Sequence, residues 1–321
     1  MQRALVGYTG FVGSNICAKA EFDGLYNTKN IEDAYGTQPE LLIYAGLRAE
    51  KYLANTAPDK DLALIEQAMD NIRGIQPRRL VLISTIDVFK TPAGADENTE
   101  IVTEGLHPYG YNRYLLEQWV RSAYADALII RLPGLFGRNI KKNFIYDYIH
   151  VIPFMLRQEK FAELSAREPM LLEAYEQTDN GFYRLCAGEE KTEDLKACFG
   201  RLGFSALNFT DSRSRYQFYD LSRLSGDIDR ALELGLRLFH PATEPVSAGE
   251  VYEYLCGKPF VNELPGEPAA YDYRTRYAED FGGRGGYISD RESVLAAIGK
   301  FVTNQSRENA DYSVSRLGFA I

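Results

Sequence analysis

The sequence predicts an α/β protein built on a doubly wound parallel sheet, with helices on both of its faces. Short, uninterrupted apolar runs at residues 41–45, 80–84 and 127–131 are typical of strands that are buried on both faces. Amphipathic segments at 59–72 and 109–125 separate these runs and are long enough for helices. Strands and helices that alternate at this spacing form parallel sheets.

The N-terminal residues predict one end of this sheet. An apolar strand is expected at 4–7, a helix at 12–20 and a second strand at 24–27. Two more sheet strands are expected much later in the chain, at 206–209 and 236–239. The sheet therefore draws on both halves of the sequence.

The alternation ends after the third buried run, and the chain beyond it predicts a smaller, mostly helical lobe. Residues 140–200 favour helices, with 181–185 ambiguous between helix and strand. Ser247 and Glu250 match a capping box at the start of another helix. A last helix is expected near 291–302.

The composition narrows the class of protein and its partners. The chain has 321 residues, of which 45% are hydrophobic and 25% charged, and its net charge is -9. A negative chain offers no global attraction to nucleic acid or to an anionic membrane, so neither is expected as a partner. The four cysteines and three histidines show no metal-ligand spacing, and we expect no metal site. The sequence shows no signal peptide or membrane-spanning run, and we expect a cytoplasmic protein.

Three glycines spaced by three residues follow the first predicted strand. Gly7 allows a tight exit from the strand, Gly10 lets a phosphate approach the backbone, and Gly13 lets the next helix pack closely. The N-terminus of that helix presents free N–H groups to an anion. The pattern predicts a Rossmann-type fold that binds the pyrophosphate of NAD(H) or NADP(H). The alternative is a purely structural strand–turn–helix unit.

The type of dinucleotide depends on the end of the second strand. NAD sites usually have an acidic residue there, which binds the ribose 2′-hydroxyl. Here the strand runs into Asn27 and Lys29, with no acid at its tip. A 2′-phosphate would suit Lys29, so NADP is favoured over NAD, although a solvated surface lysine explains Lys29 equally well.

The simplest division of the chain has two domains. Residues 1–140 and about 204–246 form the NAD(P)-binding domain, and about 141–203 with 247–321 form a substrate-binding lobe.

Three further segments occur in an order known from one family. STIDVF at 84–89 resembles S-[ST]-x-x-V-Y, YGYNR at 109–113 followed by Glu117 resembles Y-G-x-S-K-x-x-x-E, and RLPGLFG at 131–137 resembles R-x-x-x-x-Y-G. As a set they resemble the extended short-chain dehydrogenase/reductases, which include nucleotide-sugar epimerases, dehydratases and reductases. The short stretch at 30–33, between the second and third strands, looks more like the dehydrorhamnose-reductase branch than the classical epimerases.

The resemblance implies the catalytic residues, and their spacing agrees with the chemistry. Hydride transfer at a carbinol carbon needs a group that exchanges the hydroxyl proton, and a tyrosine can do so beside a cation. Tyr109 and Arg113 are four residues apart and share one helix face. By resemblance, Tyr109 is the acid/base, Thr85 orients the substrate oxygen, and Arg113 replaces the family's lysine. Ile86 stands where dehydratases carry an acid, which argues against dehydration.

The resemblance also implies two sets of binding residues. The cofactor would be held by Gly7, Thr9, Gly10, Phe11, Val12, Gly13, Asn27, Lys29, Ala45, Gly46, Ser84, Tyr109, Arg113, Leu132 and Pro133. The diphosphate of a nucleotide sugar would be met by arginines and an asparagine, because guanidinium groups pair with phosphate in a bidentate way. With the orienting hydroxyl, the substrate set is Thr85, Asn143, Arg213 and Arg215. Homo-oligomers, often dimers, are usual in the family, so the resemblance implies a possible homodimer.

The leading hypothesis is an NAD(P)-dependent oxidoreductase or epimerase that acts by hydride transfer on a nucleotide-linked sugar. Arg113 in place of lysine motivates the alternative, a weakly active or inactive NAD(P)-binding sensor or scaffold. A reductase of small carbonyl compounds is a third possibility, which the large lobe after residue 140 disfavours. The sequence does not name the sugar.

Overall fold

The computed structural model of the chain describes residues 2–178 and 181–317, with side chains as far as residue 305. The chain divides into two compact units. Unit 1 contains the chain up to Ile140 together with Arg215–Val246 and Ala269–Ile298, and unit 2 contains Lys141–Ser214, Ser247–Pro268 and the chain from Gly299. No helix among the described residues is long and apolar enough to cross a membrane.

Unit 1 is built on a six-stranded sheet with the order β12-β5-β4-β3-β1-β2. Every neighbouring pair is parallel, which confirms the Rossmann-type α/β fold that the buried apolar runs predict. Its strands are β1 (Arg3–Val6), β2 (Gly24–Tyr26), β3 (Leu41–Tyr44), β4 (Leu80–Thr85), β5 (Leu128–Leu132) and β12 (Leu238–Phe239).

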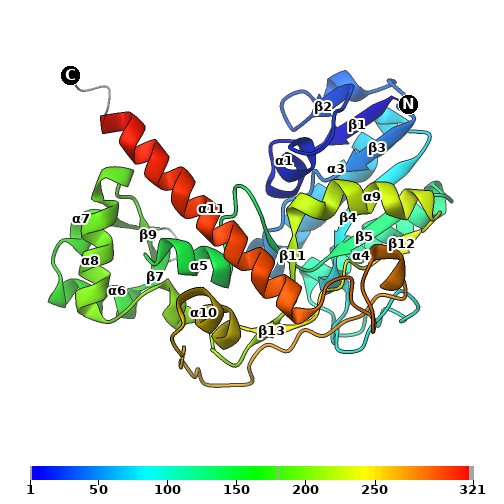
Figure 1. Cartoon of the computed structure of the whole chain (residues 1–321). Coiled ribbons are helices and arrows are strands. Elements are labelled where there is room, and N and C mark those ends of the chain that lie inside the picture. Colours follow the sequence, from blue (N-terminus) through cyan, green and yellow to red (C-terminus); the bar gives the residue numbers. More distant parts are fainter. Residues whose placement is uncertain (1, 179–180, 318–321) are drawn as a thin grey trace. The chain divides into compact units, whose positions relative to one another are not determined.

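Helices cover both faces of this sheet (Figure 1). On one face, Leu5 and Ile43 pack in a cluster that includes Ile16 of α1 (Phe11–Cys17) and Ile228 of α9 (Leu224–Glu233). On the other face, the alternate strand residues pack with side chains of α3 (Pro58–Ile75) and α4 (Pro108–Ala123). Alternate residues of a strand point to opposite faces, so one strand supplies both cores.

Several short elements complete unit 1. Strand β6 pairs in parallel with β11, beside the main sheet. The sequence pattern did not indicate helix α2, which lies between β3 and α3. These elements are α2 (Lys51–Thr56), β6 (Gly134–Phe136), β10 (Arg215–Tyr216), β11 (Phe218–Asp220), β13 (Val246–Ser247), and the 3-10 helices η1 (Ile31–Ala34), η2 (Ile86–Val88), η5 (Leu221–Arg223) and η6 (Glu279–Phe281).

Unit 2 contains a small antiparallel sheet, with the order β7-β9-β8, that the sequence did not predict clearly. The segment at 181–185, ambiguous in the sequence, forms the central strand. The elements are α5 (Phe144–His150), β7 (Met155–Arg157), α6 (Gln158–Arg167), α7 (Leu171–Ala174), β8 (Tyr175–Gln177), β9 (Phe182–Leu185), η3 (Glu189–Lys191), α8 (Thr192–Leu202), η4 (Ala206–Phe209) and α10 (Ala248–Cys256). The last described helix, α11 (Arg291–Leu317), belongs to unit 1 as far as Ile298 and to unit 2 from Gly299.

The prediction of a strand at 206–209 is wrong, because these residues form the 3-10 helix η4. The side chain of Asn208 accepts a hydrogen bond from the backbone N–H of Ser205 at 2.8 Å. This local bond satisfies the backbone at the helix start and competes with sheet pairing. The capping box at Ser247 is confirmed: its hydroxyl accepts the Glu250 N–H at 3.1 Å, and the Glu250 carboxylate accepts the Ser247 N–H at 2.6 Å.

The borders of the two units differ from the simple division of the sequence. Residues 204–214 belong to unit 2, and 269–298 belong to unit 1. Part of the reason is Gln217, which lies in unit 1 and is almost fully buried. Its amide donates to the carbonyl of Tyr273 at 2.9 Å and accepts the Tyr273 N–H at 2.9 Å. The late segment is thereby bonded to the sheet unit.

Candidate active site

The glycine turn after β1 is closely packed. Gly7 has φ +93°, and a Cβ there would lie 2.4 Å from the carbonyl oxygen of Ala45. A Cβ on Gly13 would lie 2.1 Å from the carbonyl oxygen of Gly7. Helix α1 begins directly after Gly10 without a side-chain cap. Its first N–H groups therefore remain available to an anion.

The turn after β2 is fixed by its own asparagines. Asn27 accepts the N–H of Lys29 at 2.8 Å, and Asn30 accepts the N–H of Asn27 at 2.8 Å. The side chain of Lys29 is exposed. This arrangement leaves Lys29 able to reach a ligand at the end of β2.

The predicted cofactor and catalytic residues of unit 1 gather at the carboxyl edge of the sheet. Ala45 and Gly46 follow β3, Thr85 ends β4, and Leu132 and Pro133 end and follow β5. These three strands and β1 are neighbours in the sheet. Parallel sheets of this kind bind ligands beyond the carboxyl ends of their strands.

Tyr109 lies in the first turn of α4 and faces the end of β4. The ring nitrogen Nδ1 of His107 caps this helix by accepting the N–H of Gly110 at 3.0 Å. A Cβ on Gly110 would lie 2.1 Å from the carbonyl oxygen of Asp87, so the glycine permits close packing of α4 on η2. The hydroxyl of Tyr109 interacts with that of Thr85. The structure thus brings the predicted acid/base and the predicted orienting hydroxyl together.

The electrostatic environment keeps Tyr109 protonated. Burial raises the pKa of its phenol above the ordinary value, and the negative charges of Asp87 and Asp61 act in the same direction. The Arg113 charge and the Thr85 hydroxyl lower the pKa but do not cancel the effect of burial. A protonated phenol at this position can donate a proton to an oxygen of a substrate.

Arg113 is buried, and its charge is already paired. Its guanidinium forms an ion pair with Asp61, donates to the carbonyl of Arg48 at 2.8 Å, and lies over the ring of Tyr109, 4.0 Å from the ring centre. Both Arg113 and Asp61 are less than 5% exposed. The guanidinium therefore supports the ring of Tyr109. Its partner Asp61 lies in no recognisable motif.

Ser84, Glu117 and Arg131 form a buried network behind the site. Arg131 contacts the Glu117 carboxylate through Nη2 at 2.6 Å and Nε at 3.0 Å, and the Ser84 hydroxyl donates to it at 2.5 Å. Because the Ser84 hydroxyl is bonded to Glu117, a contact of Ser84 with a cofactor would have to use its backbone. Two residues of the recognised motifs, Glu117 and Arg131, are thus joined by an ion pair.

A second group of polar side chains near Tyr109 was missed in the sequence. The Lys51 ammonium, at the start of α2, lies 3.0 Å from the Asp87 carboxylate. Tyr271 is half-buried and interacts with the same ammonium. Asp87 belongs to a recognised motif, but Lys51 and Tyr271 lie in segments without any pattern.

The predicted substrate residues lie in different units. Asn143 and Arg213 belong to unit 2, and Arg215 belongs to unit 1 with an exposed side chain. Arg213 is already paired with Asp211 at 2.7 Å and with Glu263 at 3.2 Å.

Asn143 has an unusual backbone. Its φ of 105° and ψ of 176° fall in a region that is essentially restricted to glycine. Its side chain accepts the N–H groups of Ile145 and Tyr146 at the start of α5. Strain of this kind clusters at functional positions, so Asn143 stays a candidate ligand of the substrate.

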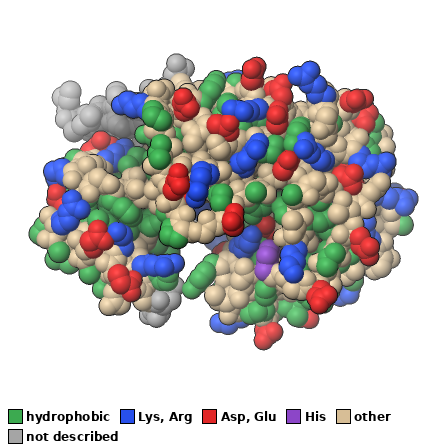
Figure 2. Space-filling model, turned by 90° about the horizontal axis from the view of Figure 1, so that it is seen from below, with side chains coloured by type: hydrophobic (Ala, Val, Ile, Leu, Met, Phe, Trp, Pro, Cys, Tyr) green, Lys and Arg blue, Asp and Glu red, His purple; other side chains and the backbone are tan. Residues whose placement is uncertain are grey.

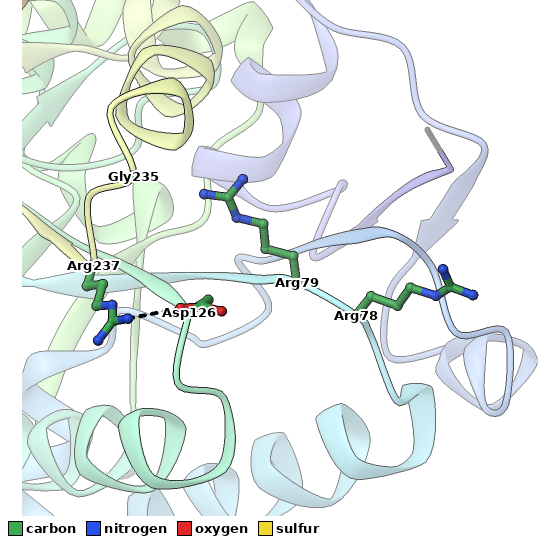
Figure 3. Close-up of a pocket in the computed structure, with 5 residues that line it drawn as sticks. All are labelled: Arg78, Arg79, Asp126, Gly235 and Arg237. Carbon is green, nitrogen blue, oxygen red and sulfur yellow. Dashed lines mark hydrogen bonds and ion pairs between the residues drawn. The ribbon is translucent and has the colours of Figure 1, made fainter.

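A cavity of about 390 Å³ opens at the opposite, amino edge of the sheet. Its lining includes Arg78, Arg79 and Arg237, which precede β4 and β12. Figure 3 shows the three guanidinium groups pointing in different directions, with Arg237 paired to Asp126 at 3.0 Å. They do not converge on one position, as a bound anion would require.

Acidic and basic side chains are interspersed over the face of the molecule that Figure 2 shows. Among the side chains that the structure describes, none gather into a group of three or more His, Cys, Asp and Glu that could hold a metal ion.

Comparison with known proteins relates the chain to solved structures. A scan against protein-family models and a search of curated proteins both find no match. A hypothetical dTDP-4-dehydrorhamnose reductase from Sulfolobus tokodaii is 17% identical, with a TM-score of 0.57 over 90% of this chain and 97% of that chain. The dTDP-4-dehydrorhamnose reductase from Bacillus anthracis, in complex with NADP, is 15% identical, with a TM-score of 0.60 over 95% and 99%.

A third similar structure is the Bordetella bronchiseptica enzyme WbmG in complex with NAD and UDP. It is 14% identical, with a TM-score of 0.60 over 94% of both chains. At these identities the three likenesses show the fold of the chain. That fold is the Rossmann-type α/β architecture of known NAD(P)-dependent sugar-nucleotide enzymes.

Proposed function

We propose that the chain is an NAD(P)-dependent oxidoreductase or epimerase that acts by hydride transfer on a nucleotide-linked sugar. The observation that carries the proposal is the placement of Tyr109. Its protonated phenol lies beside the Thr85 hydroxyl at the carboxyl edge of the sheet, which also carries the glycine turn. The similar structures include reductases and an epimerase of nucleotide sugars, and they do not favour an inactive sensor.

The chain's own residues divide the work at this site. The glycine turn and the start of α1 would hold the pyrophosphate, and the bound dinucleotide would supply or accept a hydride. Thr85 would orient the oxygen of the substrate, and Tyr109 would exchange a proton with that oxygen. Asn143, Arg213 and Arg215 remain the proposed ligands of the nucleotide diphosphate. Arg213 would then have to exchange its carboxylate partners for phosphate.

The cofactor we favour is NADP, because Lys29 is exposed at the end of β2, where no acid stands. A Lys29→Ala variant should bind NADPH about tenfold more weakly, since a charge-assisted bond is lost, and should bind NADH as before. Fluorescence titration of the two nucleotides would measure both affinities. Equal losses for NADH and NADPH would count against a 2′-phosphate contact.

The glycine turn offers a test of the cofactor site that needs no substrate. Gly13→Ala places a methyl group 2.1 Å from the Gly7 oxygen, so the turn must open and NADPH affinity should fall at least about tenfold. Gly226→Ala is the matched control, because Gly226 lies in α9 and its Cβ would meet nothing within 4 Å. The control should bind NADPH normally. Equal binding by both variants would contradict the proposed site.

The reaction itself is tested with nucleotide-linked 4-ketosugars. A reductase should oxidise NADPH with at least one member of a panel that varies the nucleotide and the sugar, followed at the nicotinamide absorbance. An epimerase should instead interconvert a nucleotide-linked sugar and its epimer without a net change in that absorbance. Product analysis would separate reduction from epimerisation. Normal cofactor binding without turnover of any member would reject the proposed function.

A further inference from the structure

The supply of protons to Tyr109 is a problem that the structure itself raises. Reduction of a ketone transfers a hydride to carbon and a proton to oxygen, so each turnover consumes one proton. If Tyr109 gives that proton, as the proposed function requires, its phenolate must be reprotonated before the next turnover. Tyr109 is 7% exposed. Direct reprotonation by bulk water is therefore restricted.

Arg113 cannot serve as the source of this proton. Its guanidinium is enclosed by Asp61, the Arg48 carbonyl and the ring of Tyr109. An arginine is not deprotonated in proteins, so it holds a charge but passes no proton. A different group must connect Tyr109 with solvent.

The side chains of the Lys51–Asp87 pair are both partly exposed to solvent. The side chain of Lys51 is 42% exposed and that of Asp87 is 20% exposed, with 3.0 Å between ammonium and carboxylate. Asp87 is fixed next to Tyr109, because its N–H donates to the Thr85 hydroxyl at 3.2 Å and its carbonyl packs against Gly110. An ammonium can release and regain a proton, unlike a guanidinium.

Tyr271 and His107 complete the surroundings of Lys51. The Tyr271 N–H donates to the carbonyl of Arg215 at 3.1 Å, which fixes its position, and its ring stacks on Tyr216 with 6.3 Å between the ring centres. The Nδ1 atom of His107 accepts a backbone N–H and therefore carries no proton itself. The titratable and charged side chains around Tyr109 and Lys51 are Asp61, Asp87, His107, Arg113 and Tyr271.

We propose that Lys51, held in place by Asp87, is the proton relay that reprotonates the Tyr109 phenolate after each turnover. The inference rests on the proposed function and narrows it. The Tyr109 O–H bond breaks as the substrate oxygen gains the proton, an N–H bond of Lys51 then breaks as the phenolate is reprotonated, and the Lys51 amine takes a proton from water. Epimerisation through a transient ketone returns the same proton and needs no such supply. The relay therefore favours net reduction as the reaction.

The first test compares two substitutions of Lys51 in the full-length protein. Lys51→Arg keeps the charge next to Asp87 but cannot release a proton, so kcat should fall about 10- to 100-fold while NADPH affinity is unchanged. Lys51→Ala should lose activity as well, and added ethylamine should restore part of it in proportion to its concentration. A purely structural lysine would leave Lys51→Arg fully active. That result, or a Lys51→Ala variant that ethylamine does not rescue, would overturn the relay.

A second test does not depend on turnover. The Asp87 charge raises the pKa of the Tyr109 phenol, so Asp87→Asn should let Tyr109 ionise at lower pH. The measurement is a 19F NMR titration of protein labelled with 3-fluorotyrosine, with Tyr109→Phe to assign the signal. An unchanged midpoint would show that the Asp87 carboxylate lies too far from Tyr109 to hold Lys51 close to the phenol, and would overturn the relay. Absence of turnover in the wild-type protein, by contrast, would reject the proposed function.

Discussion

The two edges of the parallel sheet in unit 1 both carry arginines, but the surroundings of these arginines differ. At the carboxyl edge, Arg131 is 2% exposed and its carboxylate partner is fully buried. At the amino edge, Arg237 is 69% exposed and its partner Asp126 is 83% exposed. Water screens the second pair and not the first. The contribution of a charged side chain to stability therefore depends on its burial and on its partners.

The two edges also differ in whether their polar side chains converge on one position. The carboxyl edge brings Thr85, Tyr109 and Asp87 together, although one of them is far from the others in sequence. The amino edge has a measurable cavity of about 390 Å³, yet its arginines diverge (Figure 3). Convergence of polar groups on one position distinguishes the candidate active site, and empty volume alone does not.

The largest effect is expected at Tyr109. Tyr109→Phe removes the hydroxyl that donates the proton and should lower kcat by roughly 100- to 10,000-fold without changing NADPH affinity. The assay is NADPH oxidation with the active ketosugar. Tyr111→Phe, on the same helix but exposed, is the matched control and should retain full activity. A Tyr109→Phe variant as active as the control would show that the catalytic centre does not lie at the carboxyl edge.

The buried ion pair gives the next largest effect, on stability. Arg131→Met leaves the Glu117 carboxylate buried without its partner, which should lower the free energy of unfolding by about 3–5 kcal/mol. Arg237→Met, at the amino edge, should change it by less than about 1 kcal/mol. Urea unfolding of both variants measures the difference. Similar losses in both variants would show that burial does not determine how much each ion pair contributes to stability.

Acid should lower the free energy of unfolding because of His240, which follows β12 at the carboxyl edge. Burial and the nearby charge of Arg131 lower its pKa from 6.5 to about 3. The unfolded chain therefore binds a proton below about pH 6.5, where the folded chain does not. The free energy of unfolding should fall by up to about 1.4 kcal/mol per pH unit as the pH decreases from 6.5 toward 3.

This pH dependence can be assigned with two variants. His240→Gln keeps a side chain that donates and accepts hydrogen bonds, and it should flatten the pH dependence of urea unfolding below pH 6.5. His150→Gln, in unit 2, is the comparison: burial also lowers the pKa of His150, but without a large shift of the kind found at His240, so this variant should flatten the slope less. If both variants kept the wild-type slope, another group would have to cause it.

The smallest effects are expected at the amino edge. Arg78 is exposed, and Arg79 donates one hydrogen bond to the Leu232 carbonyl at 3.1 Å. Alanine at either position should change the free energy of unfolding by no more than about 1 kcal/mol and should leave NADPH binding and kcat unchanged. A large loss of nucleotide affinity in either variant would place a ligand site at the edge where we propose none.

The parts of the fold and site that depend on local sequence were predictable. Buried apolar runs located the main strands β3, β4 and β5, and glycine spacing located the turn at Gly7. Thr85 and Tyr109 were found because each lies in a short recognisable motif. The interaction between their hydroxyls follows from the parallel sheet, which places α4 beside the end of β4.

The parts that depend on contacts between distant segments were not predictable. Asp61 pairs with Arg113 across 52 positions, and Tyr271 reaches Lys51 from the late segment of unit 1. No periodicity encodes such pairs. The strand expected at 206–209 failed for a related reason: its apolar residues fit a strand, but a bond between Ser205 and Asn208 favours a tight helical turn.

The packing around Gly110 gives the glycine of the Y-G-x-S-K-like motif a structural reason. The space that a Cβ of residue 110 would occupy is filled by the Asp87 carbonyl, so the glycine sets how closely helix α4 approaches η2. A distant homologue could keep Thr85, Tyr109 and Lys51 and still misalign them if alanine stood at position 110. Searches for chains with this chemistry should therefore read position 110 together with the reactive side chains.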